Sequence, residues 1–281
     1  RELQRQDKNL RIISYSSQEV CTVLNLLTAE RIKLISSKKL WIILGLLIFL
    51  PLYQAGLTEF NSHYGVDPEQ AKDKVINGAT GILMLEKNGL NILFIIGAFI
   101  SFFIGEEFQN GTIRNALSLG RSRTHYYLTK LSAAALVTLI ASVIMTALGM
   151  ICYSMLYGFG DVPGISNYMV FSAKVFVTLY LLILANISVY VMISFLAKSS
   201  GIALVWTFIY TAVTAAAPSL FQHTENFGEL TYWFTESFFI FMNFADSSTI
   251  EIYPKMVLVS IVTIVVSSVI GIIMFKRTDI K

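Results

Sequence analysis

Six stretches of the chain are long, apolar and almost free of charged side chains. They cover residues 40–56, 89–105, 131–157, 168–196, 200–221 and 255–275. A helix that crosses the hydrocarbon core of a bilayer needs about 20 predominantly apolar residues, and these stretches approach or exceed that length. The strands of a transmembrane barrel would instead give short segments of alternating apolar and polar residues. The pattern therefore predicts an all-α, polytopic membrane protein with six transmembrane helices.

The composition supports this interpretation. Hydrophobic residues make up 55% of the 281 residues and charged residues only 14%, whereas a soluble domain carries about 25% charged residues. The net charge of +3 is too small to indicate a nucleic-acid partner. The two cysteines, Cys21 and Cys152, indicate neither a disulfide framework nor a metal site. The first part of the chain is polar and basic, so we expect no cleavable signal peptide.

Lysine and arginine are distributed unevenly between the connections. Sixteen of the 21 lie before the first span, between the second and third, between the fourth and fifth, or after the sixth, and four lie in the other connections. Cytoplasmic connections carry the excess of Lys and Arg in membrane proteins. Both termini are therefore predicted to be cytoplasmic, in a multi-pass protein of the cell membrane. Lys174 lies inside the fourth span and is expected to extend toward the membrane surface.

Residues 20–39 precede the first span and carry an apolar and a basic face. Leu27 and Leu34 lie on the apolar stripe, while Glu30, Arg31 and Lys33 lie on its flank. Such a helix lies in the membrane surface, where a basic side chain near anionic lipid contributes about 1 kcal/mol. We expect an amphipathic interfacial helix here, bound to membrane lipids, rather than a plain linker. Residues 1–19 show no clear period and are expected to be a tail, which leaves 40–281 as the transmembrane domain.

Two external connections differ in composition. The connection over 57–88 is polar and contains several glycines, which predicts a loop. The connection over 221–254 has seven aromatic residues within thirteen positions, namely Tyr232, Trp233, Phe234, Phe238, Phe239, Phe241 and Phe244. They are typical of an aromatic belt at the outer interface, or of an external re-entrant helical hairpin packed against protein. The sequence leaves both interpretations open.

The connection between the second and third spans carries most of the functional signal. Glu106 and Glu107 stand where the second span meets the cytoplasm. Gly111 interrupts the helix there, and Thr112 can cap a new one. Unpaired carboxylates at a membrane edge are costly, so we expect these two to pair with arginines at 114, 121 or 123.

A short helix follows this interruption. Ile113, Ala116 and Leu117 share one face of it, Gly120 ends it, and Lys130 begins the next span. A short helix presented between two spans is suited to docking on a partner. An ordinary charged loop that obeys the positive-inside rule is the simpler alternative.

The motif resembles a known family. The pattern Glu107-x-x-x-Gly111-Thr112-Ile113-Arg114-x-x-Leu117, followed by Ser122-Arg123, Tyr126 or Tyr127 and Lys130, is similar to the second-to-third connection of ABC exporter permeases. The relevant six-span branch includes the bacitracin- and lantibiotic-immunity permeases. The preceding run from Ala29 to Leu34 resembles the amphipathic elbow helix of that family. The resemblance covers residues ~24 to 281 in layout.

The resemblance implies a function and a set of site residues. The ATPase-coupling residues would be Glu106, Glu107, Gly111, Thr112, Ile113, Arg114, Leu117, Arg121 and Arg123, and the elbow-helix residues Glu30, Arg31 and Lys33. Among them, Ile113, Arg114 and Leu117 would face the ATPase. The chain lacks a G-x-x-x-x-G-K-[ST] phosphate loop, so ATP and Mg would be bound by a separate cytoplasmic ATPase dimer. A second copy or a related permease would complete the transporter, and the cargo would be an amphipathic peptide or antibiotic.

Two other function classes fit less well. A membrane-embedded enzyme, such as an intramembrane protease or a lipid-modifying enzyme, needs convergent catalytic groups. Glu106-Glu107 resembles the start of a Glu-Glu-x-x-x-Arg protease motif, but Gly111 stands where that motif has arginine. A secondary carrier would need paired, interrupted helices, which these spans lack. Asn186, in mid-span, is expected to make an interhelical hydrogen bond rather than bind substrate.

Overall fold

The structure is a computed structural model that describes residues 28–64, 76–120, 122–162, 164–165, 167–222, 228–244 and 247–278. The regular elements in these ranges are all helices. An entry helix (residues 28–36) precedes α2 (Lys38–Tyr64), η1 (Ala79–Leu83), α4 (Met84–Lys87), α5 (Gly89–Gln109), α6 (Thr112–Ser118), α7 (Arg123–Tyr157), α8 (Tyr168–Ala197), α9 (Ser200–Gln222), η2 (Gly228–Trp233), α10 (Ser237–Phe241), η3 (Ser247–Ile252) and α11 (Tyr253–Arg277).

Six of the described helices are long and apolar enough to cross a membrane, namely α2, α5, α7, α8, α9 and α11. The predicted all-α fold with six spans is therefore confirmed. Several helices are longer than their apolar stretches. The helix α2 continues to Tyr64, and α7 begins at Arg123 because the side chain of Ser122 accepts a hydrogen bond from the backbone N–H of His125 and caps its first turn.

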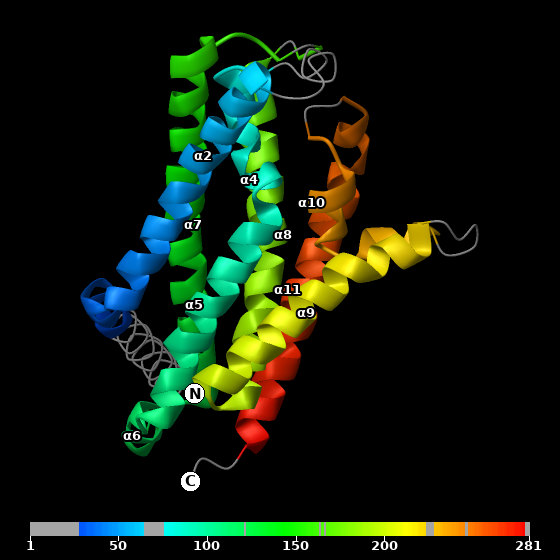
Figure 1. Cartoon of the computed structure of the whole chain (residues 1–281). Coiled ribbons are helices and arrows are strands. Elements are labelled where there is room, and N and C mark those ends of the chain that lie inside the picture. The colour runs from blue at the N-terminus through cyan, green and yellow to red at the C-terminus, as the bar shows by residue number, and fades with distance from the viewer. Residues whose placement is uncertain are drawn as a thin grey trace, which may run out of the picture.

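The helices form a bundle with α8 at its centre (Figure 1). This helix packs against α5, α7, α9 and α11, and α2 packs along α7. The apolar stretch of α8 is 61% buried within the chain, whereas that of α9 is only 17% buried. Figure 1 shows why: α9, in yellow, leans away from the bundle. Most of its surface is consequently left for lipid or for another protein.

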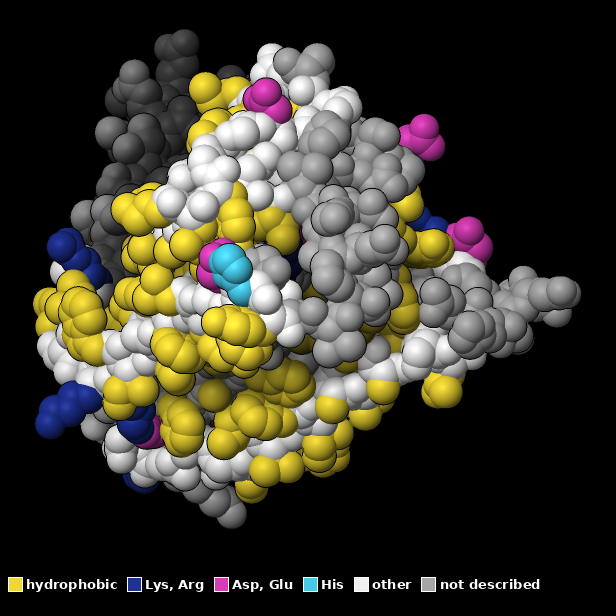
Figure 2. All heavy atoms as spheres, turned by 45° about the horizontal axis from the view of Figure 1, so that its top comes forward, with side chains coloured by type: hydrophobic (Ala, Val, Ile, Leu, Met, Phe, Trp, Pro, Cys, Tyr) yellow, Lys and Arg dark blue, Asp and Glu magenta, His cyan; other side chains and the backbone are white. Residues whose placement is uncertain are grey.

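The described surface is rich in apolar side chains. Figure 2 shows one face on which hydrophobic side chains cover large areas, while charged side chains are scattered. Ile42, Val143 and Val265 are half or more exposed, one on each of three spans. A soluble monomer rarely exposes large continuous apolar patches, so this surface is suited to lipid. The chain is a multi-pass membrane protein.

The segment over residues 76–88 corrects the prediction of a polar loop. Residues Ala79 to Leu85 are all buried, and η1 lies against α7. Gly81 permits this contact, because a Cβ there would lie 2.5 Å from Met150 Cα. The polar side chain of Asn77 is satisfied locally, since it donates to the carbonyl of Asp161 at 2.8 Å and accepts from the N–H of Thr80 at 3.0 Å. The chain therefore folds back into the bundle before α5 begins.

The aromatic connection before α11 is ordered as the short helices η2, α10 and η3. The first two contact α9, and η2 and η3 contact α11. Phe238 and Phe244 are fully buried, whereas Trp233 is 52% exposed. The aromatic side chains thus divide between core packing and the surface. Their depth in a membrane stays a prediction.

Candidate site at one end of the bundle

The site is built where α5 ends, α6 follows and α7 begins. Figure 1 shows α6 at the same end of the bundle as the entry helix and the end of α11. On α5, Phe103 and Glu107 are four residues apart, and on α7 so are Tyr126 and Lys130. Residues at this spacing share one face of a helix. These two faces meet beneath α6.

Lys130 is the centre of this meeting point. Its side chain is fully buried, and its Nζ lies 2.6 Å from Glu30 Oε2 and 2.7 Å from Glu107 Oε2. The same ammonium lies 4.2 Å from the ring centroid of Phe103 and 5.6 Å from that of Tyr126. A buried charge is tolerated only when it is paired and hydrogen-bonded. Two carboxylates and two ring faces meet that requirement here.

The entry helix completes the ion pairs. Glu30 and Lys33 are three residues apart on it, and both turn toward the bundle. Lys33 Nζ donates to Glu107 Oε1 at 3.0 Å and lies 3.8 Å from Glu30 Oε1. The hydroxyl of Tyr126 donates to the other oxygen of Glu107. We call Glu30, Lys33, Glu107, Tyr126 and Lys130 the joint, because together they tie the entry helix, α5 and α7 in one neutral cluster.

Lys33 stands at the solvent side of the joint. Partial burial of its ammonium acts to lower its pKa, but the charge and hydrogen bond of Glu107, with the charge of Glu30, outweigh that effect. The pKa of Lys33 is therefore raised above the ordinary value of a lysine. Lys33 consequently stays positively charged throughout the physiological pH range.

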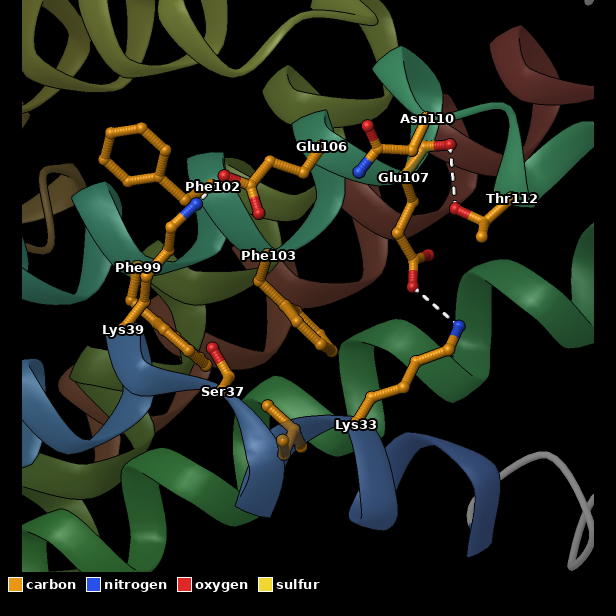
Figure 3. A pocket seen from close by; sticks show the side chains of 11 residues that line it. Lys33, Ser37, Lys39, Phe99, Phe102, Phe103, Glu106, Glu107, Asn110 and Thr112 are labelled. Atoms are coloured by element: carbon orange, nitrogen blue, oxygen red, sulfur yellow. Dashed lines mark hydrogen bonds and ion pairs between the residues drawn. The ribbon is translucent and has the colours of Figure 1, made fainter.

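A cavity of ≈ 270 Å³ lies beside the joint, between the entry helix and α5. Figure 3 shows Lys33 reaching Glu107 across it, and Thr112 donating to the backbone carbonyl of Glu107. Phe99, Phe102 and Phe103 form its apolar wall. Lys39, at the start of α2, pairs with Glu106 on the same rim. Both predicted carboxylates are therefore held by lysines of the segment that precedes and begins the first span.

The α6 helix is fixed by its own first residues. Gly111 precedes it with φ 68°, a left-handed conformation that glycine adopts without strain. Thr112 does not cap the helix as predicted, because its hydroxyl instead donates to the last turn of α5 at 3.1 Å. Ile113 is fully buried and belongs to the core of this chain. The predicted contact of Ile113 with an ATPase is therefore wrong, and the residue anchors α6 instead.

The outer side of α6 is exposed. Arg114 and Asn115 are exposed, Leu117 is half-buried against the core, and Leu119 just beyond the helix is 82% exposed. Gly120 ends this turn with φ 80°. The chain thus presents a short ridge that carries an exposed cation at Arg114 and, five residues later, an exposed leucine.

Two of the three predicted arginine partners, Arg114 and Arg123, make no ion pair with the carboxylates, and pairing with Arg121 stays a prediction. Arg123 donates from Nη1 to the carbonyls of Phe275, Lys276 and Thr278 at 2.9, 3.0 and 2.6 Å. It therefore caps the end of α11 and does not pair with Glu107. Arg114 points outward on α6, and Arg121 lies outside the described residues.

The amphipathic elbow helix over residues 20–39 stays a prediction, of which the structure describes only part. Residues 28–36 are helical, and residues 20–27 lie outside the described part of the chain, as do 1–19. Arg31 is exposed as expected for a lipid-facing side chain. Glu30 is instead 3% exposed and sits inside the joint. The entry helix is therefore held by buried ion pairs as well as by any lipid.

The sequence pattern does not indicate that the side chain of Lys130 is fully buried or that Leu119 is exposed. The pattern predicts Lys130 only as the basic start of a span. The available signal was the pair Tyr126 and Lys130, four residues apart at the start of an apolar helix, because a lysine inside a span needs a partner. Glu30 offers the same signal among basic neighbours.

Comparison with known proteins fits this geometry. The family model described as ABC-2 family transporter protein matches residues 26–214, from the entry helix into α9. No curated protein matches the chain significantly. Every residue of the joint and of α6 falls inside the matched range. With two thirds of its length matched, the chain belongs to the ABC-2 family of transporter proteins and is a transmembrane subunit of an ABC transporter.

Proposed function

We propose that the chain is the permease of an ATP-driven exporter in the cell membrane, a non-catalytic subunit that receives the work of a separate cytoplasmic ATPase dimer through α6. One observation carries the proposal: α6 is exposed on one side and anchored on the other by Ile113 and the joint. An element built in this way moves as a unit with the spans that flank it.

The exposed side of α6 has the chemistry of a docking ridge. Arg114 supplies a cation, and Leu119, five residues later, supplies an exposed apolar side chain. Interfaces of this kind depend on a few apolar and arginine anchors surrounded by weaker contacts. The family resemblance supports the ATPase as the partner. That partner would bind ATP and Mg.

The joint supports transmission of force. A displacement of α6 by the ATPase would be transmitted to Glu107 through the turn at Gly111 and through the hydrogen bond from the Thr112 hydroxyl to the backbone carbonyl of Glu107. Glu107 in turn is bonded to α7 through Lys130 and to the entry helix through Lys33. Buried, hydrogen-bonded ion pairs hold one geometry because breaking them leaves an uncompensated charge. The three elements would therefore tilt together when the ATPase closes.

An amphipathic cargo agrees with the exposed apolar face of α9. The groove between α8 and α9 has a volume of ≈ 680 Å³ and is lined mainly by apolar side chains such as Met192, Ile193 and Trp206. A second permease, identical or related, would provide the second docking ridge that an ATPase dimer needs.

The test truncates the exposed side chains of Arg114 and Leu119 and leaves the buried Ile113 unchanged. Arg114→Ala combined with Leu119→Ala should reduce the amount of ATPase that co-purifies by at least about tenfold, because truncation of a hot spot costs ~2 kcal/mol or more. Transport in vesicles should be lost as well. The matched control is Lys174→Ala with Met169→Ala, which changes an exposed cation and an exposed apolar residue of α8. Equal ATPase recovery from the two double variants would overturn the docking role of α6.

A further inference from the structure

A fully buried carboxyl group lies far from the joint, in the α10 segment (residues 228–244). Glu236 directly precedes α10 and is 0% exposed. Glutamate is almost never fully buried unless it is paired. Within the described part of the chain, no ion pair reaches Glu236. Its burial therefore needs another explanation than charge pairing.

Neutral groups from two spans surround this carboxyl. The hydroxyl of Thr214 on α9 lies 2.7 Å from Glu236 Oε1, and that of Thr235 lies 3.0 Å from Oε2. The nearby titratable side chains are Tyr190 on α8 and Tyr210 on α9. Neither tyrosine supplies a positive charge. Nothing described around Glu236 favours its ionised form as a salt bridge would.

A continuous series of hydrogen bonds runs from α8 through Glu236 to α9. Asn186 Nδ2 on α8 donates to Thr235 Oγ1 at 2.9 Å. Thr235 has a single hydroxyl hydrogen, which it donates to Glu236 Oε2. The predicted interhelical bond of Asn186 is therefore corrected: its partner lies in the turn before α10 and not in a neighbouring helix. One direction of donation therefore runs from Asn186 through Thr235 to Glu236.

At the α9 end of this hydrogen-bond series, one more hydrogen atom is needed. Thr214 also has one hydroxyl hydrogen, yet its Oγ1 lies 2.8 Å from the carbonyl oxygen of Tyr210, as well as 2.7 Å from Glu236. If Glu236 carries a proton, it donates that proton to Thr214, and Thr214 donates its own to the carbonyl. Every short contact is then a proper hydrogen bond. If Glu236 is ionised, Thr214 has one hydrogen for two acceptors.

We propose that Glu236 is a proton-binding site whose neutral form fastens the α10 segment to α8 and α9, and that loss of this proton loosens the segment. The proposal concerns the opposite half of the chain from α6 and does not rest on ATPase coupling.

The direction of the pH effect follows from linkage. Burial raises the pKa of Glu236, and the hydrogen bonds that the ionised form would accept from Thr214, from the backbone N–H of Glu236 and from Thr235 offset this only in part. The fastened segment therefore binds more protons than the loosened one between the ordinary and the raised pKa. Fastening is complete below the ordinary pKa of a glutamate and weakens as the pH rises through the raised pKa.

Glu236→Gln is the matched variant, because an amide has the same shape and supplies both bonds without a proton. Its NH₂ donates to Thr214, and its oxygen accepts from Thr235. The first measurement is the infrared spectrum of the purified full chain. The carbonyl band of a protonated carboxylic acid should be present in the wild type at neutral pH and absent from Glu236→Gln. Identical spectra in this region would overturn the proposal.

The second measurement follows opening of the segment. Thr231→Cys places a thiol at a position that is 5% exposed in η2, and Ser219→Cys places one at an exposed position of α9. Both are made in a background without Cys21 and Cys152. The maleimide labelling rate at 231, divided by that at 219, should rise at least about tenfold between about pH 5 and about pH 8.5 with Glu236. It should stay flat with Glu236→Gln.

Two results would overturn the assignment. The same pH profile for both residues at 236 would show that another group controls opening. Protection of Thr231→Cys by Na⁺ or K⁺ at fixed pH, lost in Glu236→Gln, would show that the oxygens hold a metal cation rather than a proton.

Discussion

Lys130 is the residue on which three elements depend. Its ammonium is fully buried between carboxylates of the entry helix and α5, at 2.6 and 2.7 Å. A fixed positive charge in this position lets Glu30 and Glu107 stay buried as carboxylates. The cluster therefore behaves as a unit, in which the cost of one change depends on the other members.

Lys130→Met should destabilise the chain by roughly 3–5 kcal/mol, because two carboxylates lose their buried partner. Thermal unfolding in detergent measures this, with Lys174→Met, an exposed lysine of α8, as the control. Adding Glu30→Gln and Glu107→Gln to Lys130→Met should recover most of the loss, since no buried charge is then left unpaired. Additive losses in the triple variant would contradict the joint.

At the scale of elements, the ends of helices are fixed by residues distant in sequence. Arg123, in the first turn of α7, donates to three carbonyls at the end of α11. The last carbonyls of a helix have no partner within it. The C-terminal end of the bundle is thereby tied to the same turn that follows α6.

Arg123→Ala should fray the last turn of α11. Hydrogen exchange of amides in 272–278 should speed up by about tenfold or more, because hydrogen bonds to a charged donor contribute roughly 1.5–3 kcal/mol. Arg114→Ala, on the exposed side of α6, is the control and should leave these amides unchanged. Unaltered exchange in Arg123→Ala would mean that the three bonds do not hold the helix end.

The crossing of α5 and α9 depends on one glycine. A Cβ at Gly105 would lie 2.4 Å from Ser200 Cα, whereas one at Gly201 would meet nothing within 4 Å. Gly105→Ala should therefore separate the helices and lower the unfolding temperature. Gly201→Ala should raise it slightly, because alanine is favoured over glycine in a helix by about 1 kcal/mol. The reverse order of unfolding temperatures would contradict the packing of α5 on α9.

The number of spans and the position of α6 were predictable, because long apolar runs and the Gly111 break are local properties of the sequence. The ion pairs were not. Glu30, Glu107 and Lys130 come from three segments, and no sequence pattern states which helix faces meet. The buried 76–88 segment differs from the predicted loop for a related reason. Its polar residues Asn77 and Thr80 bond to each other and to the connection after α7, so their polarity did not indicate exposure.

Across the whole molecule, the two regions differ in the buried interactions that hold them together. The end that holds α6, the entry helix and the end of α11 is fastened by charges (Figure 1). The α10 segment is held by neutral hydrogen bonds around the buried Glu236 and by the ion pair of Glu229 with Lys255 of α11 nearer the surface. Buried charges thus fix the end that holds α6, whereas the buried contacts of the α10 segment are neutral.

Photo-crosslinking can show whether α6 is the surface through which an ATPase drives this chain. A photo-reactive amino acid is placed at Leu119, and in a separate variant at Tyr64, which is 75% exposed at the other end of α2. After illumination of intact membranes, mass spectrometry identifies the crosslinked protein. If α6 docks on the ATPase, Leu119 should crosslink to a protein with a G-x-x-x-x-G-K-[ST] phosphate loop, and Tyr64 should not. Crosslinking of that protein from Tyr64, or from neither position, would contradict docking through α6.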